Sequence, residues 1–185
     1  MKEHELHNYK LVLQYEGIRY NGWQKQKNQE NTIQEVVENA VFDGTGERAE
    51  VIGSGRTDAG THAMGQVANV KLGQDLEPER LMDNINKHLP SDIKILECEK
   101  VDNRFHARLN AKAKTYMYTL CVGKKPDVFN RRTVLHYCAD LDVDAMKKAA
   151  EYLKGEHDFM SFCSNKRTKK STVRKIYDIE IIKDG

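Results

Sequence analysis

The stretch that organises this sequence is Gly53-Ser54-Gly55-Arg56-Thr57-Asp58-Ala59-Gly60-Thr61-His62. An apolar run predicted as a strand enters it at residues 49–52, and a second such run leaves it at residues 66–72. Three of its ten residues are glycine, which allows backbone turns that are closed to other residues. The pattern therefore predicts a rigid loop between two strands.

One carboxylate, Asp58, lies at the centre of this loop, with Arg56 two residues before it and His62 four residues after it. A nearby cation favours the ionised form of a carboxylate. One interpretation is therefore an anionic nucleophile or base beside a positive charge. The other is a long turn in which Asp58 only accepts hydrogen bonds from loop amides. For His62, a hydrogen-bonded loop residue is favoured over a base.

The composition is that of a soluble globular protein. The chain has 185 residues, of which 39% are hydrophobic and 31% charged, enough for one large or two small domains. No apolar run is long enough to cross a membrane. The four cysteines are widely spaced and form no C-x-x-C pair, which indicates free thiols rather than a disulfide framework or a zinc site. We therefore expect a cytoplasmic protein with no metal and no membrane contact.

Positive charge is concentrated in two places, although the net charge is only +2. Residues 165–175 contain no acidic residue and six basic ones, Lys166, Arg167, Lys169, Lys170, Arg174 and Lys175. This is the second basic set along the chain, and the first basic set is Arg104, His106, Arg108, Lys112 and Lys114. Either set alone is equally consistent with a solvated surface. Together they favour a polyanionic partner, RNA or DNA.

The first hundred residues predict a complete small domain. Residues 9–15 alternate between apolar and polar and indicate a strand. The capping box Thr32-Ile33-Gln34-Glu35 begins an amphipathic helix that ends near Gly44, and Pro78 begins a second helix that Pro90 stops. Two further strands flank the Gly-rich loop, and another is predicted at residues 93–101. The order is therefore β-α-β-β-α-β, which is that of a ferredoxin-like fold, with an antiparallel sheet covered on one face by two helices. Trp23, in the link between strand and helix, is expected in the core rather than stacked on a base.

The remaining residues predict a second α+β part. The expected elements are a strand at residues 114–122, a helix at 143–153, a loop at 155–159 and a strand at 173–182. In the first of these strands, Tyr116 and Tyr118 lie on one face, and Tyr118 is expected to pack in the sheet. The last residues, Lys183-Asp184-Gly185, are a hairpin signal without a following strand. We therefore expect an α+β protein of two ferredoxin-like (RRM-like) halves with antiparallel sheets. The first half is residues 1–103, and the second is residues 104–185, incomplete and truncated at the hairpin turn.

Several motifs in one order resemble those of the tRNA pseudouridine synthase A (TruA) family. The first is Gly55-Arg56-Thr57-Asp58-Ala59-Gly60, followed by His62. The others are Asn21-Gly22-Trp23-Gln24, Thr32-Ile33-Gln34-Glu35, Gly65-Gln66-Val67, residues 86–93 with Leu89-Pro90, Phe105-His106-Ala107-Arg108, Tyr116-Met117-Tyr118, and Gly155-Glu156-His157-Asp158-Phe159-Met160-Ser161-Phe162. The resemblance extends over essentially the whole chain.

The resemblance implies a function and a set of site residues. Asp58 matches the catalytic aspartate of the family, Arg56 the motif arginine and Tyr116 the active-site tyrosine. Family members are homodimers that convert uridine to pseudouridine at positions 38 to 40 of tRNA, in the anticodon stem-loop. They use no cofactor and have two α+β domains with a basic cleft between them.

One departure leaves a second hypothesis open. The family continues past the final predicted strand into further strands, a helix and an arginine-bearing motif that reaches the catalytic aspartate, and none of these follows here. The alternative to a tRNA isomerase is therefore a catalytically inactive, truncated RNA-binding module of the same fold. A hydrolase that uses Asp58 is a more distant third.

Overall fold

The computed structural model describes residues 6–28, 30–123, 125, 127–163 and 171–183. The chain forms two compact units, Met1–Tyr116 and Met117–Gly185. The predicted domain division after residue 103 stays a prediction, but the first compact unit extends beyond it. No helix among the described residues is long and apolar enough to cross a membrane.

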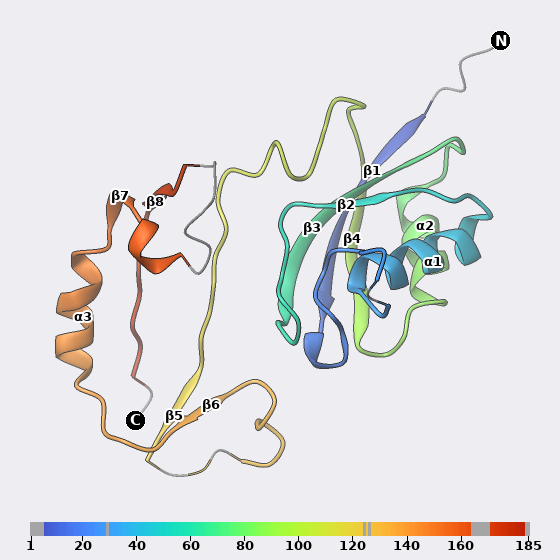
Figure 1. The fold of residues 1–185 in the computed structure, drawn as a ribbon. Helices are drawn as coiled ribbons and strands as arrows, with labels where there is room; N and C mark the ends of the chain where they lie inside the picture. The colour runs from blue at the N-terminus through green and yellow to red at the C-terminus, as the bar shows by residue number, and fades with distance from the viewer. Residues whose placement is uncertain (1–5, 29, 124, 126, 164–170, 184–185) are drawn as a thin grey trace. The chain divides into compact units, whose positions relative to one another are not determined.

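The first unit has the predicted order of elements. It comprises β1 (His7–Tyr15), a short 3-10 helix (Gly17–Arg19), α1 (Ile33–Thr45), β2 (Val51–Gly53), β3 (Ala63–Leu72), α2 (Pro78–Asn86) and β4 (Ile93–Val101). The strands lie in the order β2-β3-β1-β4, and each pairs antiparallel with its neighbour. Figure 1 shows α1 and α2 on the same side of this sheet. The predicted α+β class is confirmed.

The core lies between this sheet and the two helices. On β1, every second side chain from Tyr9 to Tyr15 is buried, as the period of a strand requires. These side chains meet the apolar positions of α1, including Ile33 and Val37, and Leu81 and Ile85 of α2. The opposite face of β1 carries Asn8, Lys10, Val12 and Gln14, and it points away from α1 and α2.

The two ends of α1 lie where the sequence predicts them. The Thr32 hydroxyl accepts a hydrogen bond from the Glu35 amide at 3.4 Å, as the capping box predicts. The helix ends near Gly44 as expected, at Thr45, and the left-handed residue that caps it is Gly46, with φ of 77°. Gly44 lies inside the helix where a Cβ would come within 3.1 Å of the Asn84 backbone of α2. The glycine therefore permits close packing of the two helices.

The described residues of the second unit form two separate strand pairs. The strands β5 (Leu120–Val122) and β6 (Leu135–Tyr137) pair in parallel, whereas β7 (Gly155–Asp158) and β8 (Val173–Ile176) pair antiparallel. Between these pairs lies α3 (Val143–Glu151), and a 3-10 helix (Met160–Phe162) follows β7.

Three predictions for this region are wrong, two in the length of a strand and one in the type of element. The predicted strand at residues 114–122 is a strand only at its last three residues, and the predicted final strand at 173–182 ends at Ile176. A strand needs a hydrogen-bonded neighbour, and the described residues supply one only along these short stretches. For the same reason residues 155–158, expected as loop, are strand β7, because β8 lies beside them.

Candidate active site

The loop between β2 and β3 is fastened to the segment that follows β1. The Trp23 amide donates to the Thr57 carbonyl at 3.0 Å, and the Gly60 amide donates to the Tyr20 carbonyl at 3.3 Å. These two bonds lie on either side of Asp58 in the sequence. The Asp58 carbonyl also accepts from the Thr61 amide at 3.1 Å and closes a turn. The main chain on both sides of Asp58 is therefore held in place.

Two glycines allow the loop to approach this segment so closely. Gly22 has φ of 80°, and a Cβ there would lie 2.6 Å from the Thr57 carbonyl oxygen. A Cβ on Gly53 would lie 2.5 Å from the Trp23 indole. The indole itself is 2% exposed and packs against the Tyr15 ring, with 6.1 Å between ring centroids. The expectation that Trp23 belongs to the core is confirmed.

Side chains from two strands also hold the loop. The hydroxyl groups of Tyr15 and Thr57 are hydrogen-bonded at 2.9 Å. Gln66, at the start of β3, accepts from the Ser54 hydroxyl at 2.8 Å and donates to the Gly55 carbonyl at 2.7 Å. Burial raises the pKa of Tyr15, although its hydrogen bonds to Thr57 and Gln66 oppose the rise. Tyr15 therefore stays a neutral donor or acceptor beside the residue that precedes Asp58.

Asp58 itself is exposed at the tip of the loop. Within the part of the chain that the structure describes, its carboxylate forms no hydrogen bond or ion pair. The interpretation of Asp58 as a turn residue that accepts bonds from loop amides is not supported, because its main-chain carbonyl is the acceptor there. The side chain is thus presented to solvent on a fixed backbone.

The expected pairing of Arg56 with Asp58 does not form among the described residues. The Arg56 Nε instead donates to the Gln24 side-chain oxygen at 3.1 Å, and the Arg56 side chain is otherwise exposed. His62 is half-buried at the end of the loop and interacts with the surrounding protein, in agreement with its expected structural role.

The segment with the first basic set is fixed to the face of the sheet opposite α1 and α2. Two asparagines, each 1% exposed, hold it from adjacent strands. The amide group of Asn8 donates to the carbonyl oxygens of Asp102 and Phe105 at 3.0 and 2.9 Å. Asn69 donates to the Asn8 side-chain oxygen at 3.1 Å and accepts from the Ala107 amide at 2.9 Å. This clamp explains why the first compact unit continues past residue 103.

The basic side chains on this segment are presented differently. Arg104, Arg108, Lys112 and Lys114 are exposed, whereas His106 is half-buried and its Nδ1 accepts from the amides of Arg108 and Leu109 at 3.2 and 3.4 Å. A methyl group built on Gly55 would collide with the Lys114 Nζ, so this ammonium group lies against the loop that carries Asp58. The sequence-predicted residues Lys166, Arg167, Lys169 and Lys170 lie outside the described residues.

Tyr116 is not in contact with a described residue through its hydroxyl or its ring. Its side chain is 73% exposed. Tyr118, expected to pack in the sheet, is 87% exposed. That expectation is wrong, because residues 114–119 have no strand ladder against which to pack. Among the described residues, no group of three or more His, Cys, Asp or Glu side chains is placed to hold a metal ion.

Comparison with known proteins shows the family of this chain. The sequence profile described as tRNA pseudouridine synthase matches residues 11–110 and 149–185. A tRNA pseudouridine synthase A 2 of Bacillus cereus is 43% identical over 180 residues, which cover 97% of this chain and 74% of the relative. The tRNA pseudouridine synthase A of Bacillus sp. strain KSM-64 is 46% identical over 95% of this chain and 72% of the relative. The chain belongs to the tRNA pseudouridine synthase family. The sequence resemblance is thereby confirmed.

Sequence reasoning missed several residues that build the site of this tRNA pseudouridine synthase family member. Asn8 and Asn69 are buried polar residues within strands, and such residues need hydrogen-bond partners. That signal was available in the Val67-Ala68-Asn69-Val70 run. The capping box predicts for Gln34 only a place at the start of a helix. In the structure Gln34 is 4% exposed and forms a hydrogen bond with Gln24, which is the partner of Arg56. Its contacts cross from α1 to another segment, which a local pattern does not indicate.

Proposed function

We propose that this chain isomerises uridine to pseudouridine in the anticodon stem-loop of tRNA, at family positions 38 to 40, with Asp58 as the catalytic carboxylate. One observation carries the proposal. The Asp58 carboxylate is exposed and unbonded among the described residues, while hydrogen bonds on both sides fix its backbone. A group held in position and left open to a substrate is what nucleophilic or general-base catalysis requires.

The reaction needs one ionised carboxylate and no redox partner. The C1′–N1 glycosidic bond breaks, the uracil turns, C5 bonds to C1′, and the proton lost from C5 is balanced by a proton gained at N1. Asp58 would either attack a carbon of the nucleotide or remove a ribose proton to give a glycal intermediate. Both routes use the same exposed carboxylate, and both leave the product an isomer of the substrate.

The target uridine must leave its stack before Asp58 can reach it, which costs a few kcal/mol. Arg56 is proposed to hold the flipped nucleotide, because a guanidinium fork suits phosphate and base edges. Tyr116 is proposed to stack on the uracil and to assist proton movement at C5 through its hydroxyl. Full turnover by a Tyr116→Phe variant would dismiss the hydroxyl role.

The tRNA is proposed to lie along the first basic set and the second. The residues proposed for this role are Arg104, His106, Arg108, Lys112 and Lys114 of the first set and Lys166, Arg167, Lys169 and Lys170 of the second. Support comes from the exposure of the arginines and lysines of the first set and from the contact of Lys114 with the Asp58 loop. We also propose a cytoplasmic homodimer, on the family resemblance, and sedimentation of the purified chain would test the dimer.

The experiment is a product analysis with matched variants. Anticodon stem-loop transcripts are incubated with the wild-type chain, with Asp58→Asn or with Asp43→Asn, and pseudouridine is mapped by nucleoside mass spectrometry. Asp43 is an exposed carboxylate on α1 and serves as the control. We expect product with the wild type and with Asp43→Asn but none with Asp58→Asn. RNA binding without product in the wild type would favour the inactive RNA-binding module instead.

A further inference from the structure

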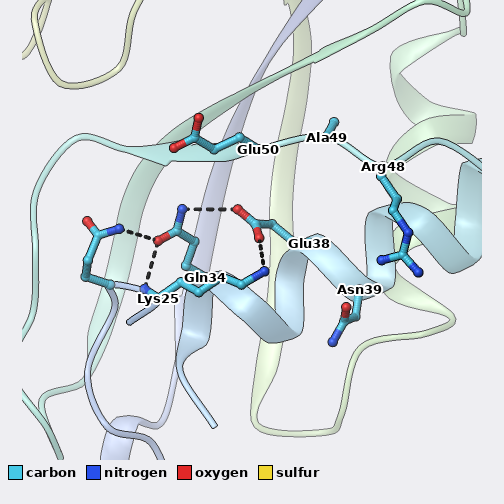
Figure 2. A pocket seen from close by; sticks show the side chains of 8 residues that line it. Lys25, Gln34, Glu38, Asn39, Arg48, Ala49 and Glu50 are labelled. Atoms are coloured by element: carbon cyan, nitrogen blue, oxygen red, sulfur yellow. Dashed lines mark hydrogen bonds and ion pairs between the residues drawn. The ribbon is translucent and has the colours of Figure 1, made fainter. Parts of the chain in front are cut away.

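A chain of side-chain hydrogen bonds connects α1 to Arg56, and it begins at a buried amide. Gln34 lies in the first turn of α1 and is 4% exposed. Its Nε2 donates to the Glu38 carboxylate at 3.1 Å (Figure 2). The same nitrogen donates to the Val51 carbonyl of β2, also at 3.1 Å. Because a carboxylate and a carbonyl can only accept, the amide nitrogen of Gln34 must face them. The oxygen of Gln34 is therefore turned toward the opposite side.

The next members of the chain have one orientation for the same reason. The Gln34 oxygen accepts from the Gln24 Nε2 at 2.7 Å and from the Lys25 amide at 2.9 Å. With its nitrogen committed to Gln34, Gln24 presents its own oxygen, which accepts from the Arg56 Nε at 3.1 Å. A guanidinium can only donate. The chain of hydrogen bonds thus runs from Glu38, which can only accept, through Gln34 and Gln24 to Arg56, which can only donate. If either glutamine exchanged the positions of its amide oxygen and nitrogen, hydrogen bonds would be lost.

The acceptor end of the chain is itself anchored. The Glu38 side chain is 13% exposed and is paired with the Lys25 Nζ at 3.1 Å. The Val51 amide donates to its other oxygen at 3.2 Å. These partners compensate the charge of a largely buried carboxylate. Lys25, Gln34 and Glu38 line a pocket of about 470 Å³ together with Glu50 and neighbouring residues. Figure 2 shows these three side chains joined by dashed lines.

We infer that Gln24 is a positioning residue for Arg56, and that Gln34 and Glu38 set the direction in which Gln24 points its oxygen. A bond at Nε fixes one edge of the planar guanidinium, so the terminal nitrogens are offered to the target nucleotide in one orientation. Side chains that lock a binding group in this way reduce the ordering required when the ligand arrives. This role of Arg56 rests on the proposed function, whereas the geometry of the chain does not.

The first test measures the geometry without any reaction. The Nε–H signal of Arg56 is identified in nitrogen-15 spectra by its loss in Arg56→Lys, and its exchange with water is followed. Gln24→Met and Gln34→Met keep side-chain length but remove the bonds, and we expect exchange to become roughly tenfold faster in both. The control is Gln26→Met, an exposed glutamine of the same segment. Within the described structure, Gln34 is linked to Arg56 only through the hydrogen bond that each makes with Gln24. Unchanged exchange in Gln34→Met would therefore overturn the inference.

The second test asks whether Gln24 acts through Arg56 during turnover. We expect Gln24→Met to lower the single-turnover rate of pseudouridine formation roughly tenfold in the wild-type background and less than about twofold in an Arg56→Ala background. Equal losses in both backgrounds, or no loss in the wild type, would contradict the inference. Thermal unfolding of each variant identifies loss of folding. A wild-type chain that forms no pseudouridine contradicts the proposed function, and the exchange measurement then still decides the inference.

Discussion

The amide of Trp23 donates a 3.0 Å hydrogen bond to the carbonyl oxygen of Thr57, the residue before Asp58. This bond joins a core residue, 2% exposed, to an exposed loop. It holds the loop that carries Asp58 against the packed part of the domain, where main-chain positions are most strongly constrained. Rigid support of an exposed carboxylate is the structural basis of the proposed activity, and it leads to the following predictions.

Gly22 and Gly46 form a matched pair for testing this support. Both have a positive φ, of 80° and 77°, but a Cβ would meet the Thr57 oxygen at Gly22 and nothing within 4 Å at Gly46. We expect Gly46→Ala to lower the free energy of unfolding by about 1 to 2 kcal/mol, the cost of the left-handed backbone. Gly22→Ala should lower it by a further 1 to 3 kcal/mol, roughly, because the loop must shift. Urea unfolding measures both.

The activities of these two variants should differ in the same way. At a temperature where both are folded, Gly46→Ala should form pseudouridine at the wild-type rate, whereas Gly22→Ala should be at least roughly tenfold slower, since a displacement near the reacting group is costly. Equal activities would show that the position of Thr57 does not matter to Asp58.

The buried hydroxyl of Tyr20 makes stability depend on pH. Burial, followed by the 2.6 Å bond that the hydroxyl donates to Asp92, raises its pKa from 10.0 to about 12. The folded protein keeps a proton that the unfolded chain loses above pH 10. This stabilisation is thus complete below about pH 10 and is lost as the pH rises through about 12, a total of about 2 to 3 kcal/mol.

The corresponding measurement is urea unfolding between about pH 10 and pH 12. We expect the free energy of unfolding to fall less steeply with pH in Tyr20→Phe than in the wild type. Tyr152→Phe, which changes a side chain that is 82% exposed, should keep the wild-type slope. Identical slopes for all three proteins would be incompatible with a protonated Tyr20 that supports the fold.

The asparagine clamp should matter both to stability and to RNA binding. Asn69→Ala removes a buried acceptor of the Ala107 amide and a donor to Asn8. We expect it to destabilise the protein by about 2 to 4 kcal/mol, because two buried polar groups lose their partner. Under conditions where the variant is folded, its tRNA affinity should also fall, since Arg104 and Arg108 lose their fixed position. Asn39→Ala, on the exposed face of α1, is the control and should change neither.

Lys114 should contribute one phosphate contact beside the catalytic loop. We expect Lys114→Ala to reduce the slope of log affinity against log salt by about one. Lys94→Ala, an exposed lysine of β4, should leave the slope unchanged. Filter binding of tRNA over a range of salt concentrations measures both slopes. A wild-type slope in Lys114→Ala would remove Lys114 from the proposed binding surface.

Patterns that depend on neighbours in the sequence predicted the fold of the first unit. The spacing of Ile33 and Val37 on one helix face and the alternation from Tyr9 to Tyr15 both identified core residues, because each repeat is the period of its own element. The Gly-rich loop also appeared at the predicted place. These features need no knowledge of distant residues.

Features that depend on distant partners escaped prediction. The prediction of a strand at residues 114–122 is wrong for residues 114–119. The alternation of side chains is a property of the local sequence, whereas a strand also needs a partner strand that is distant in the sequence. Arg56 lies two residues from Asp58, and proximity in sequence suggested a pair, yet Gln24 is its partner in the described structure. The clamp from Asn8 to Asp102 likewise joins residues that are far apart in the chain. Polar contacts of this kind follow from the assembled fold.

The measurement that tests the central claim most directly is tritium release from tRNA labelled with [5-³H]uridine, with the wild-type chain and Asp58→Asn compared under single-turnover conditions. The C5 proton leaves only when a new bond forms at that carbon, so release reports the isomerisation itself. We predict release by the wild type and none by Asp58→Asn, with tRNA affinity nearly unchanged in the variant. Release by Asp58→Asn at the wild-type rate would contradict the assignment of Asp58 as the catalytic carboxylate.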